Sequence, residues 1–173
     1  MLDIKIEGAL NGQINAELYS SYLYLSMSAD CADKGLTGFA KWFKVQAQEE
    51  VMHGMRLFNY VVERGGRVEL EAIEKPKTSW KTVLDAMKAA YEHETKVTKM
   101  INDLVDLAQA GKDHATNSML QWFVDEQVEE EATADDMVTR LQMIGEAKGA
   151  LYMLDKEVGA RMTVFPDPVP EGD

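Results

Sequence analysis

A carboxylate and an imidazole stand three residues apart in the stretch Glu49-Glu50-Val51-Met52-His53. On a helix, the spacing of Glu50 and His53 places both side chains on one face. A hard oxygen donor beside an imidazole nitrogen suits a transition metal such as iron, manganese or zinc. The same spacing also occurs on solvated helix faces with a surface histidine, so the pair indicates a metal only together with other features.

The helix face that carries this pair is otherwise apolar. Its members are Phe39, Phe43, Ala47, Glu50, His53 or Gly54, Leu57 and Val61. A charged carboxylate in the middle of an apolar face is costly to bury unless another charge compensates it. A bound metal ion would compensate Glu50, and so would a salt bridge, so this helix alone leaves both alternatives open.

Five helices are predicted from the periodicity of the apolar residues and from the glycines that end the periodic stretches. Their ranges are 5–34, 37–64, 82–110, 113–144 and 147–160. Thr37 is expected to cap the second helix. Residues 65–81 have little helical pattern, and a connection of this length can traverse a bundle and make the third helix parallel to the second. The predicted fold class is all-α: a four-helix bundle with a long crossover between helices two and three and a short fifth C-terminal helix.

Each of the four long helices carries polar or metal-binding residue types near the middle of its apolar stripe. They are Glu17 on the first helix, Glu50 and His53 on the second, Glu94 on the third, and Gln127 and Glu130 on the fourth. Antiparallel helices of equal length would bring these mid-helix positions to one level. Four buried carboxylates would repel one another without cations. Two divalent ions would neutralise them, so the pattern predicts a two-metal site inside the bundle.

These residues together resemble the ferroxidase centre of non-haem ferritins of the prokaryotic and archaeal type, within the ferritin-like di-iron family. The resemblance extends from about residue 5 to residue 160. It implies that Glu17, Glu50 and His53 bind a first iron ion. It also implies that Glu94 and Glu130 bind a second iron ion, with Glu50 as the bridge between the two.

The same resemblance assigns further residues around the two irons. Gln127 would hydrogen-bond the oxygen or water species between them, and Tyr24 would lie beside the centre. The alternative for Tyr24 is an ordinary core tyrosine with a satisfied hydroxyl. A third iron site, found in some prokaryotic members, would map to Glu49, Glu126, Glu129 and Glu130. The alternative is a solvated acidic face, because acids are frequent between Asp125 and Glu131.

Departures from other members of the superfamily narrow the resemblance. The fourth helix offers Gln127 and Glu130 in place of a second Glu-x-x-His motif, which argues against bacterioferritin and di-iron oxygenases. Val51 follows Glu50 where bacterioferritin has a methionine that serves haem, so no haem is expected. His93 and His114 match no role in the family and are expected to be surface histidines.

Composition restricts the function further. The 173 residues are 46% hydrophobic, enough for the core of one domain, and the net charge is −12. This charge disfavours nucleic acid and anionic membranes as partners and attracts cations. The chain has no run of 18 apolar residues and no apparent signal peptide, so a cytoplasmic protein with no membrane span is expected. Residues 1–162 are expected to form the domain, and 163–173 a proline-rich tail.

The function implied by the resemblance is iron storage with ferroxidase activity. Fe(II) would be oxidised to Fe(III) by dioxygen or hydrogen peroxide and stored as ferric oxyhydroxide inside a homo-oligomeric cage of about 24 copies. One alternative is a di-iron peroxidase or oxidase that is not dedicated to storage. Another is a structural helical protein whose acids pair with lysines.

The fifth helix is predicted to contribute to assembly. Its apolar stripe consists of Leu151, Met153, Leu154 and Val158. No face of its own bundle is expected to remain for this stripe to cover, and an exposed apolar stripe usually marks an interface. The alternative is that the helix folds back on its own subunit as a lid on the end of the bundle.

Overall fold

The computed structural model describes residues 2–165 of the chain. Its helices are α1 (Ile4–Asp33), α2 (Thr37–Glu63), α3 (Val83–Ala110), α4 (His114–Ile144) and α5 (Lys148–Val158). No strand occurs among the described residues, which confirms the predicted all-α class. Residues 166–173, most of the predicted tail, lie outside the described residues. The division of the chain at residue 162 stays a prediction.

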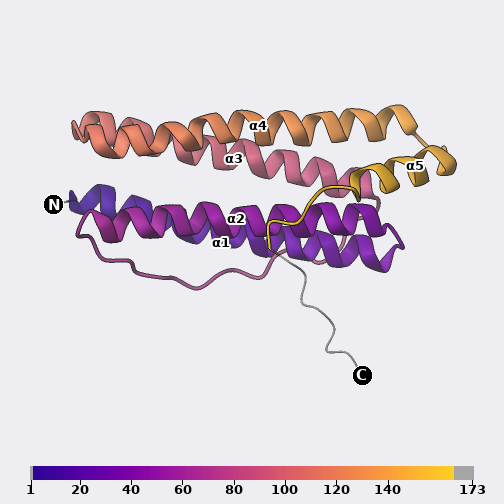
Figure 1. The fold of residues 1–173 in the computed structure, drawn as a ribbon, viewed down its shortest axis with the longest axis horizontal. Coiled ribbons are helices and arrows are strands. Elements are labelled where there is room, and N and C mark those ends of the chain that lie inside the picture. Colours follow the sequence, from indigo (N-terminus) through magenta and orange to yellow (C-terminus); the bar gives the residue numbers. More distant parts are fainter. Residues whose placement is uncertain (1, 166–173) are drawn as a thin grey trace, which may run out of the picture.

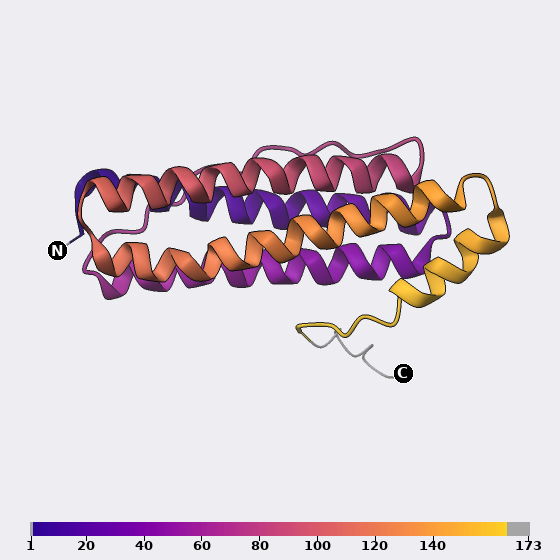
Figure 2. The ribbon, with the colours of Figure 1, turned by 90° about the horizontal axis from the view of Figure 1, so that it is seen from above.

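Four long helices lie side by side along the length of the molecule (Figures 1 and 2). The closest pairs are α1 with α2 and α3 with α4. Between α2 and α3, the chain runs back along the whole bundle, so that α3 starts at the end where α2 started. The crossover is therefore real, and α2 and α3 are parallel, as the length of this connection predicted.

Local sequence explains most of the helix ends. The Asp3 carboxylate accepts a hydrogen bond from the backbone N–H of Lys5 and begins α1. Thr82 and Asp85 form a reciprocal capping box at the start of α3. After α1, Gly35 has a φ of +76°, a left-handed conformation that glycine adopts without steric cost. These ends fix the lengths of the helices and so the level at which their middles meet.

The start of α2 is capped by another helix and not by its own chain. Thr37 was expected to be the cap, but it is the first helical residue, and Leu36 before it has no polar side chain to offer. The buried carboxylate of Asp155 in α5 accepts the backbone N–H of Phe39 at 2.9 Å instead. Gly38 permits this approach, because a Cβ there would lie 1.7 Å from the carbonyl oxygen of Asp155.

The expected position of α5 was wrong. Leu154 is 4% exposed and Val158 is also buried, and both belong to the core of their own subunit. Leu151 packs half-buried against the same core. Of the four residues in the predicted stripe, only Met153 is exposed, at 68%. The bundle does retain a face at this end, and α5 folds back onto it, as Figure 2 shows.

The apolar core consists of two clusters separated by a polar layer. One lies towards the α5 end and includes Tyr24, Phe39, Phe43, Met87 and Leu154. The other lies towards the opposite end and includes Leu10, Ile14, Leu57, Ile101, Leu120 and Phe123. Burial of this apolar surface on both sides stabilises the bundle and offsets the cost of burying the polar layer between them.

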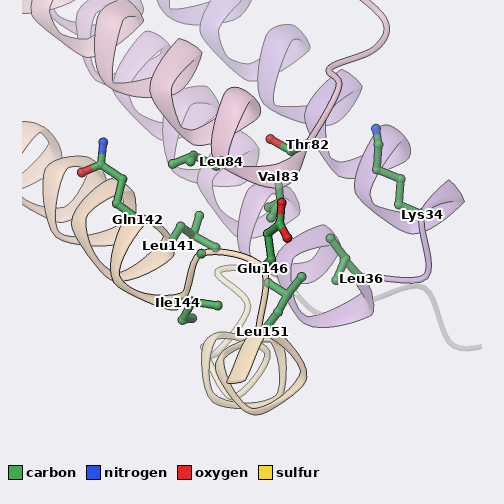
Figure 3. Close-up of a pocket in the computed structure, with 11 residues that line it drawn as sticks. Lys34, Leu36, Thr82, Val83, Leu84, Leu141, Gln142, Ile144, Glu146 and Leu151 are labelled. Carbon is green, nitrogen blue, oxygen red and sulfur yellow. The ribbon is translucent and has the colours of Figure 1, made fainter. Parts of the chain in front are cut away.

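A cavity of about 560 Å³ opens at the α5 end of the bundle. Figure 3 shows apolar side chains of the α2, α3, α4 and α5 ends around it, among them Leu36, Val83, Leu141 and Leu151. It contains none of the predicted site residues. Within residues 2–165, no helix combines the length and the apolarity needed to cross a membrane.

Candidate metal centre

The polar layer contains all six residues predicted for the two-metal site. All are buried, and they come from all four long helices: Glu17 from α1, Glu50 and His53 from α2, Glu94 from α3, and Gln127 and Glu130 from α4. The mid-helix positions of the four long helices therefore lie at one level, as the sequence predicted. Side chains that lie 113 residues apart in sequence, from Glu17 to Glu130, share one layer of the core.

Glu17, Glu50 and His53 form the tightest part of the layer. One ligand atom from each lies within 4.8 Å of the others. The Nδ1 atom of His53 is 3.3 Å from Glu50 Oε2 and 3.9 Å from Glu17 Oε2. The three-residue spacing on α2 brings the imidazole and the first carboxylate together, and the α1–α2 packing adds the second.

Glu94 and Glu130 complete the layer, and each is held by neutral donors. The Tyr24 hydroxyl donates a hydrogen bond to Glu94 Oε1. Gln127 Nε2 donates to the other carboxylate oxygen of Glu94 at 3.2 Å. Gln46 Nε2 donates to Glu130 Oε2 at 2.6 Å. Tyr24 is therefore not merely a core aromatic, because its hydroxyl orients a carboxylate of the centre.

Two buried glutamines of the layer were missed from the sequence. Gln13 Nε2 donates to Glu17 Oε1 at 2.8 Å, and Gln46 Nε2 lies 3.5 Å from Glu50 Oε1. Both glutamines stand four residues before their glutamate, so one turn of helix joins each pair. This repeated Gln-x-x-x-Glu spacing is a signal that the sequence does contain.

His93 was expected at the surface, and that expectation was wrong. The residue is half-buried, and its Nε2 lies 2.7 Å from the hydroxyl oxygen of Ser20. Its ring lies edge-on to Tyr24, with 6.3 Å between the ring centroids. Burial lowers the pKa of His93 to about 4, so the imidazole is neutral at pH 7. His114 is exposed, as expected.

Burial favours protonated carboxyls throughout the layer. The pKa of Glu17 and that of Glu50 are raised well above the usual range, mainly by burial and also by neighbouring carboxylate charges. Burial raises the pKa of Glu94 as well, and raises that of Glu130 to about 8 with a further contribution from the Glu94 charge. A cation bound among these groups would favour their ionised forms.

The donor set fits a pair of metal ions. Glu17 Oε2 is buried and accepts no hydrogen bond, a costly arrangement for a carboxylate oxygen in a protein core. A metal ion would supply the missing partner. Carboxylate oxygens with one imidazole nitrogen suit iron, manganese or zinc, whereas calcium and magnesium prefer oxygen alone.

The residues predicted for a third metal site are only partly brought together. They are Glu49, Glu126, Glu129 and Glu130. Glu126 and Glu130 place one ligand atom each within 4.8 Å of one another and of a ring nitrogen of His53. Glu49 forms an ion pair with Arg161 from the segment that follows α5. The remaining glutamate of the four is exposed on α4.

A four-helix bundle with a long crossover and a buried carboxylate–histidine cluster defines a class of metal-binding helical proteins. Residues 7–144 match the family model of the ferritin-like domain. The chain is 42% identical over 161 residues to a bacterial non-heme ferritin of Bacteroides fragilis, covering 93% of this chain and all of that protein. A bacterial non-heme ferritin of Staphylococcus aureus is 39% identical, with 93% and 97% covered. The chain belongs to the ferritin family.

Solved structures agree with this assignment. An open-pore ferritin from the hyperthermophilic archaeon Archaeoglobus fulgidus is 53% identical, with a TM-score of 0.93 over 94% of this chain and all of that one. An engineered closed form of the ferritin from the same organism is 52% identical, with a TM-score of 0.94 over 95% of this chain and all of that one. The ferritin-like fold and the resemblance drawn from the sequence are therefore confirmed.

Proposed function

We propose that this chain is the subunit of an iron-storage protein that oxidises Fe(II) to Fe(III) in the polar layer and keeps the product as ferric oxyhydroxide. The observation that carries the proposal is the cluster of Glu17, Glu50 and His53, in which a buried carboxylate oxygen has no hydrogen-bond donor. The names of the relatives support it, since they are non-haem ferritins.

Iron is the substrate of this centre, and each ligand has a proposed role. Glu17, Glu50 and His53 hold one Fe(II) ion. Glu94 and Glu130 hold the second, and Glu50 bridges the two. The buried positions of all five support the assignment, because an unpaired carboxylate at such positions is costly without a cation.

The ligand set explains why oxidation is favourable. Anionic oxygen ligands stabilise Fe(III) more than Fe(II), because the ion of higher charge gains more from them. Two Fe(II) ions together supply the two electrons that reduce dioxygen to hydrogen peroxide, or hydrogen peroxide to water. A single histidine among carboxylates leaves the ferric product free to move on to the mineral, as storage requires.

The surrounding hydrogen bonds hold the ligands in position. Tyr24 and Gln127 donate to the two oxygens of Glu94 and fix the orientation of its carboxylate. Burial raises the pKa of Glu17 and that of Glu50, so Fe(II) binding is expected to release protons there, because the ionised forms are the metal ligands. We also propose a third iron site that uses Glu126 and Glu130, with Glu49 and Glu129 as further ligands.

A di-iron peroxidase or oxidase is the competing function, and iron loading distinguishes the two. The parent protein receives Fe(II) without oxygen and is then exposed to air. We expect oxidation in the first seconds and final loading far above two irons per subunit. Loading that stops at two would support the redox enzyme, because only storage needs more.

The assignment of the ligands is tested by single substitutions. Glu17→Ala, Glu50→Ala and His53→Ala are each expected to slow the initial oxidation of Fe(II) by about tenfold or more while leaving the helical circular dichroism unchanged. Glu63→Ala is the matched control, since Glu63 is exposed on the same helix as Glu50. Parent rates in all three variants would overturn the assignment.

A further inference from the structure

Arg161 places a cationic side chain at the edge of the proposed metal centre. It follows α5 in sequence but lies over α2, 112 residues away from its ion-pair partner Glu49. One guanidinium nitrogen pairs with the Glu49 carboxylate, and another donates to Gln46 Oε1 at 2.9 Å. The guanidinium carbon is 5.1 Å from the centroid of the Trp42 ring. These three contacts hold the side chain in one place, with 27% of it exposed.

The segment that carries Arg161 is fastened on both sides of it. Before Arg161, a Cβ on Gly159 would lie 2.9 Å from the Cα of Gly38, so the two backbones are in close contact. After Arg161, the backbone N–H groups of Val164 and Phe165 donate to Gln48 Oε1 at 2.9 and 3.1 Å. Residues 159–165 therefore lie along α2, and α2 supplies every one of these contacts.

The Arg161–Glu49 ion pair lies one amide away from an outer carboxylate of the centre, because Gln46 contacts both Arg161 and Glu130. Burial raises the pKa of Glu49 and the Arg161 guanidinium lowers it, while the Glu126 charge makes a smaller contribution that raises it. Burial and the Glu94 charge raise the pKa of Glu130 most, and the Glu49 charge raises it further. Glu126 and Glu130 already bring ligand atoms within 4.8 Å of each other and of His53. Glu49 is not one of those three residues, and its carboxylate is paired with the Arg161 guanidinium.

We propose that Arg161 is a built-in competitor for the outer metal site, so that a divalent ion gains Glu49 as a ligand only when the guanidinium leaves. The inference rests on the proposed metal centre and adds to it the residue that sets how tightly the outer ion binds. It also implies that the contacts of residues 159–165 with α2 weaken when a metal ion binds the outer site.

Gln46 links the departure of the Arg161 guanidinium to the inner centre. Its amide oxygen accepts from Arg161, while its amide nitrogen donates to Glu130 at 2.6 Å. The guanidinium therefore fixes which end of the amide faces the carboxylates. Once Arg161 leaves, Gln46 is free to rotate, and the donor to Glu130 is no longer fixed. The two inner ions and the outer ion would thus bind with coupled affinities.

A calorimetric titration with Zn²⁺ under metal-free, oxygen-free conditions tests the competition, because Zn²⁺ binds the same ligands without redox chemistry. In Arg161→Gln, we expect the weakest of three sites per subunit to tighten by about three- to tenfold, and the two tighter sites to change by less, through the freed Gln46. Arg140→Gln is the matched control, since Arg140 forms its ion pair with Glu157 on the surface.

The double variant Arg161→Gln with Glu49→Gln tests whether the tighter binding depends on the Glu49 carboxylate. In this variant, the affinity gained at the weakest Zn²⁺ site should be lost. Two tight sites with an unchanged third site in Arg161→Gln would overturn the competition and leave the proposed function intact. Failure of the parent to bind two ions would overturn both. Arg161→Lys keeps the charge but cannot span Gln46 and Glu49 together, so an intermediate affinity is expected.

Hydrogen exchange provides a readout that does not depend on affinity. The peptide that contains Val164 and Phe165 is followed by mass spectrometry in the parent protein, with and without saturating Zn²⁺. We expect the two amides to exchange faster when the metal is bound, because the guanidinium no longer anchors the segment. In Glu49→Gln, metal should leave their exchange unchanged. Equal exchange in the parent with and without Zn²⁺ would contradict the displacement.

Discussion

At the scale of single residues, protons and metal ions compete for the same buried carboxylates. Burial in the polar layer disfavours the ionised forms of Glu17, Glu50, Glu94 and Glu130, and repulsion between carboxylates adds to the effect. The metal-free layer therefore holds protons at pH values where exposed glutamates have lost them. The stability of the metal-free protein should therefore fall as pH rises, whereas the stability of a protein with salt-bridged acids rises with pH.

The pH dependence of Glu130 has a defined sign. Its pKa is about 8 in the folded protein, against an ordinary value of 4.5, so the folded state binds more protons than the unfolded state between these limits. The stability that Glu130 contributes is complete below pH 4.5 and is lost as pH rises to about 8, with a slope of up to about 1.4 kcal/mol per pH unit. The melting temperature of the EDTA-treated protein should fall across this interval.

Glu130→Gln should make that fall shallower, because the glutamine does not titrate. Glu129→Gln is the control, since Glu129 is exposed on the same helix, and it should follow the parent. Thermal unfolding is followed by circular dichroism at several pH values. A profile for Glu130→Gln that is as steep as that of the parent would contradict the assignment of the slope to Glu130.

The sequence predicted the acidic and histidine residues of the helix stripes and missed Gln13, Gln46 and Arg161, although each glutamine stands one turn before a predicted glutamate. Glu50 and His53 are recognisable because three residues on a helix return to the same face. Gln46 has its shortest contact with Glu130, which is 84 residues away, and Arg161 arrives from beyond α5. Such contacts depend on how helices and segments pack, and periodicity within one helix carries no information about them.

At the scale of elements, α5 and the start of α2 form one unit. The Asp155 carboxylate satisfies a backbone N–H at the α2 N-terminus, where a negative charge is also favoured by the helix dipole. The stripe of α5 predicted that this helix buries one face but could not identify the surface that covers it. The partner is the neighbouring end of the same bundle, because Gly38 lets the two backbones approach.

Gly38→Ala should therefore destabilise the subunit. A Cβ at this position would lie 1.7 Å from the Asp155 carbonyl oxygen, a backbone atom that moves only if α5 moves. A loss of about 1–3 kcal/mol of unfolding free energy is expected from such overpacking. Gly12→Ala is the control, since nothing lies within 4 Å of its added Cβ, and it should stabilise α1 by about 0.5–1 kcal/mol. Urea unfolding measures the stability of both variants. A Gly38→Ala variant that is as stable as the parent would contradict the tight contact.

At the scale of the whole molecule, one subunit leaves apolar surface uncovered away from α5. Tyr22 is 50% exposed and Leu25 is 45% exposed on α1, and both line a small pocket with Ile73 of the crossover. This surface joins α1 to the connection, whereas Leu154, which was expected to be part of an interface, lies in the core. A storage protein needs a closed container, so a second copy of the chain is the partner that the proposed function requires.

We therefore predict a hollow homo-oligomer of about 24 copies that uses the surface of Tyr22, Leu25 and Ile73 for one of its contacts. Each subunit carries a net charge of −12, so copies repel one another and assembly should strengthen as salt screens that repulsion. Light scattering of the parent at low and high salt measures the particle mass.

Leu25→Glu should shift the mass to smaller species at both salt concentrations, because it places a charge in an apolar contact. Gln121→Glu adds the same charge at an exposed position of α4 and should assemble as the parent does. A parent protein that stays monomeric or dimeric at every salt concentration would have no interior for a mineral, and the proposed function would then fall to the di-iron redox enzyme.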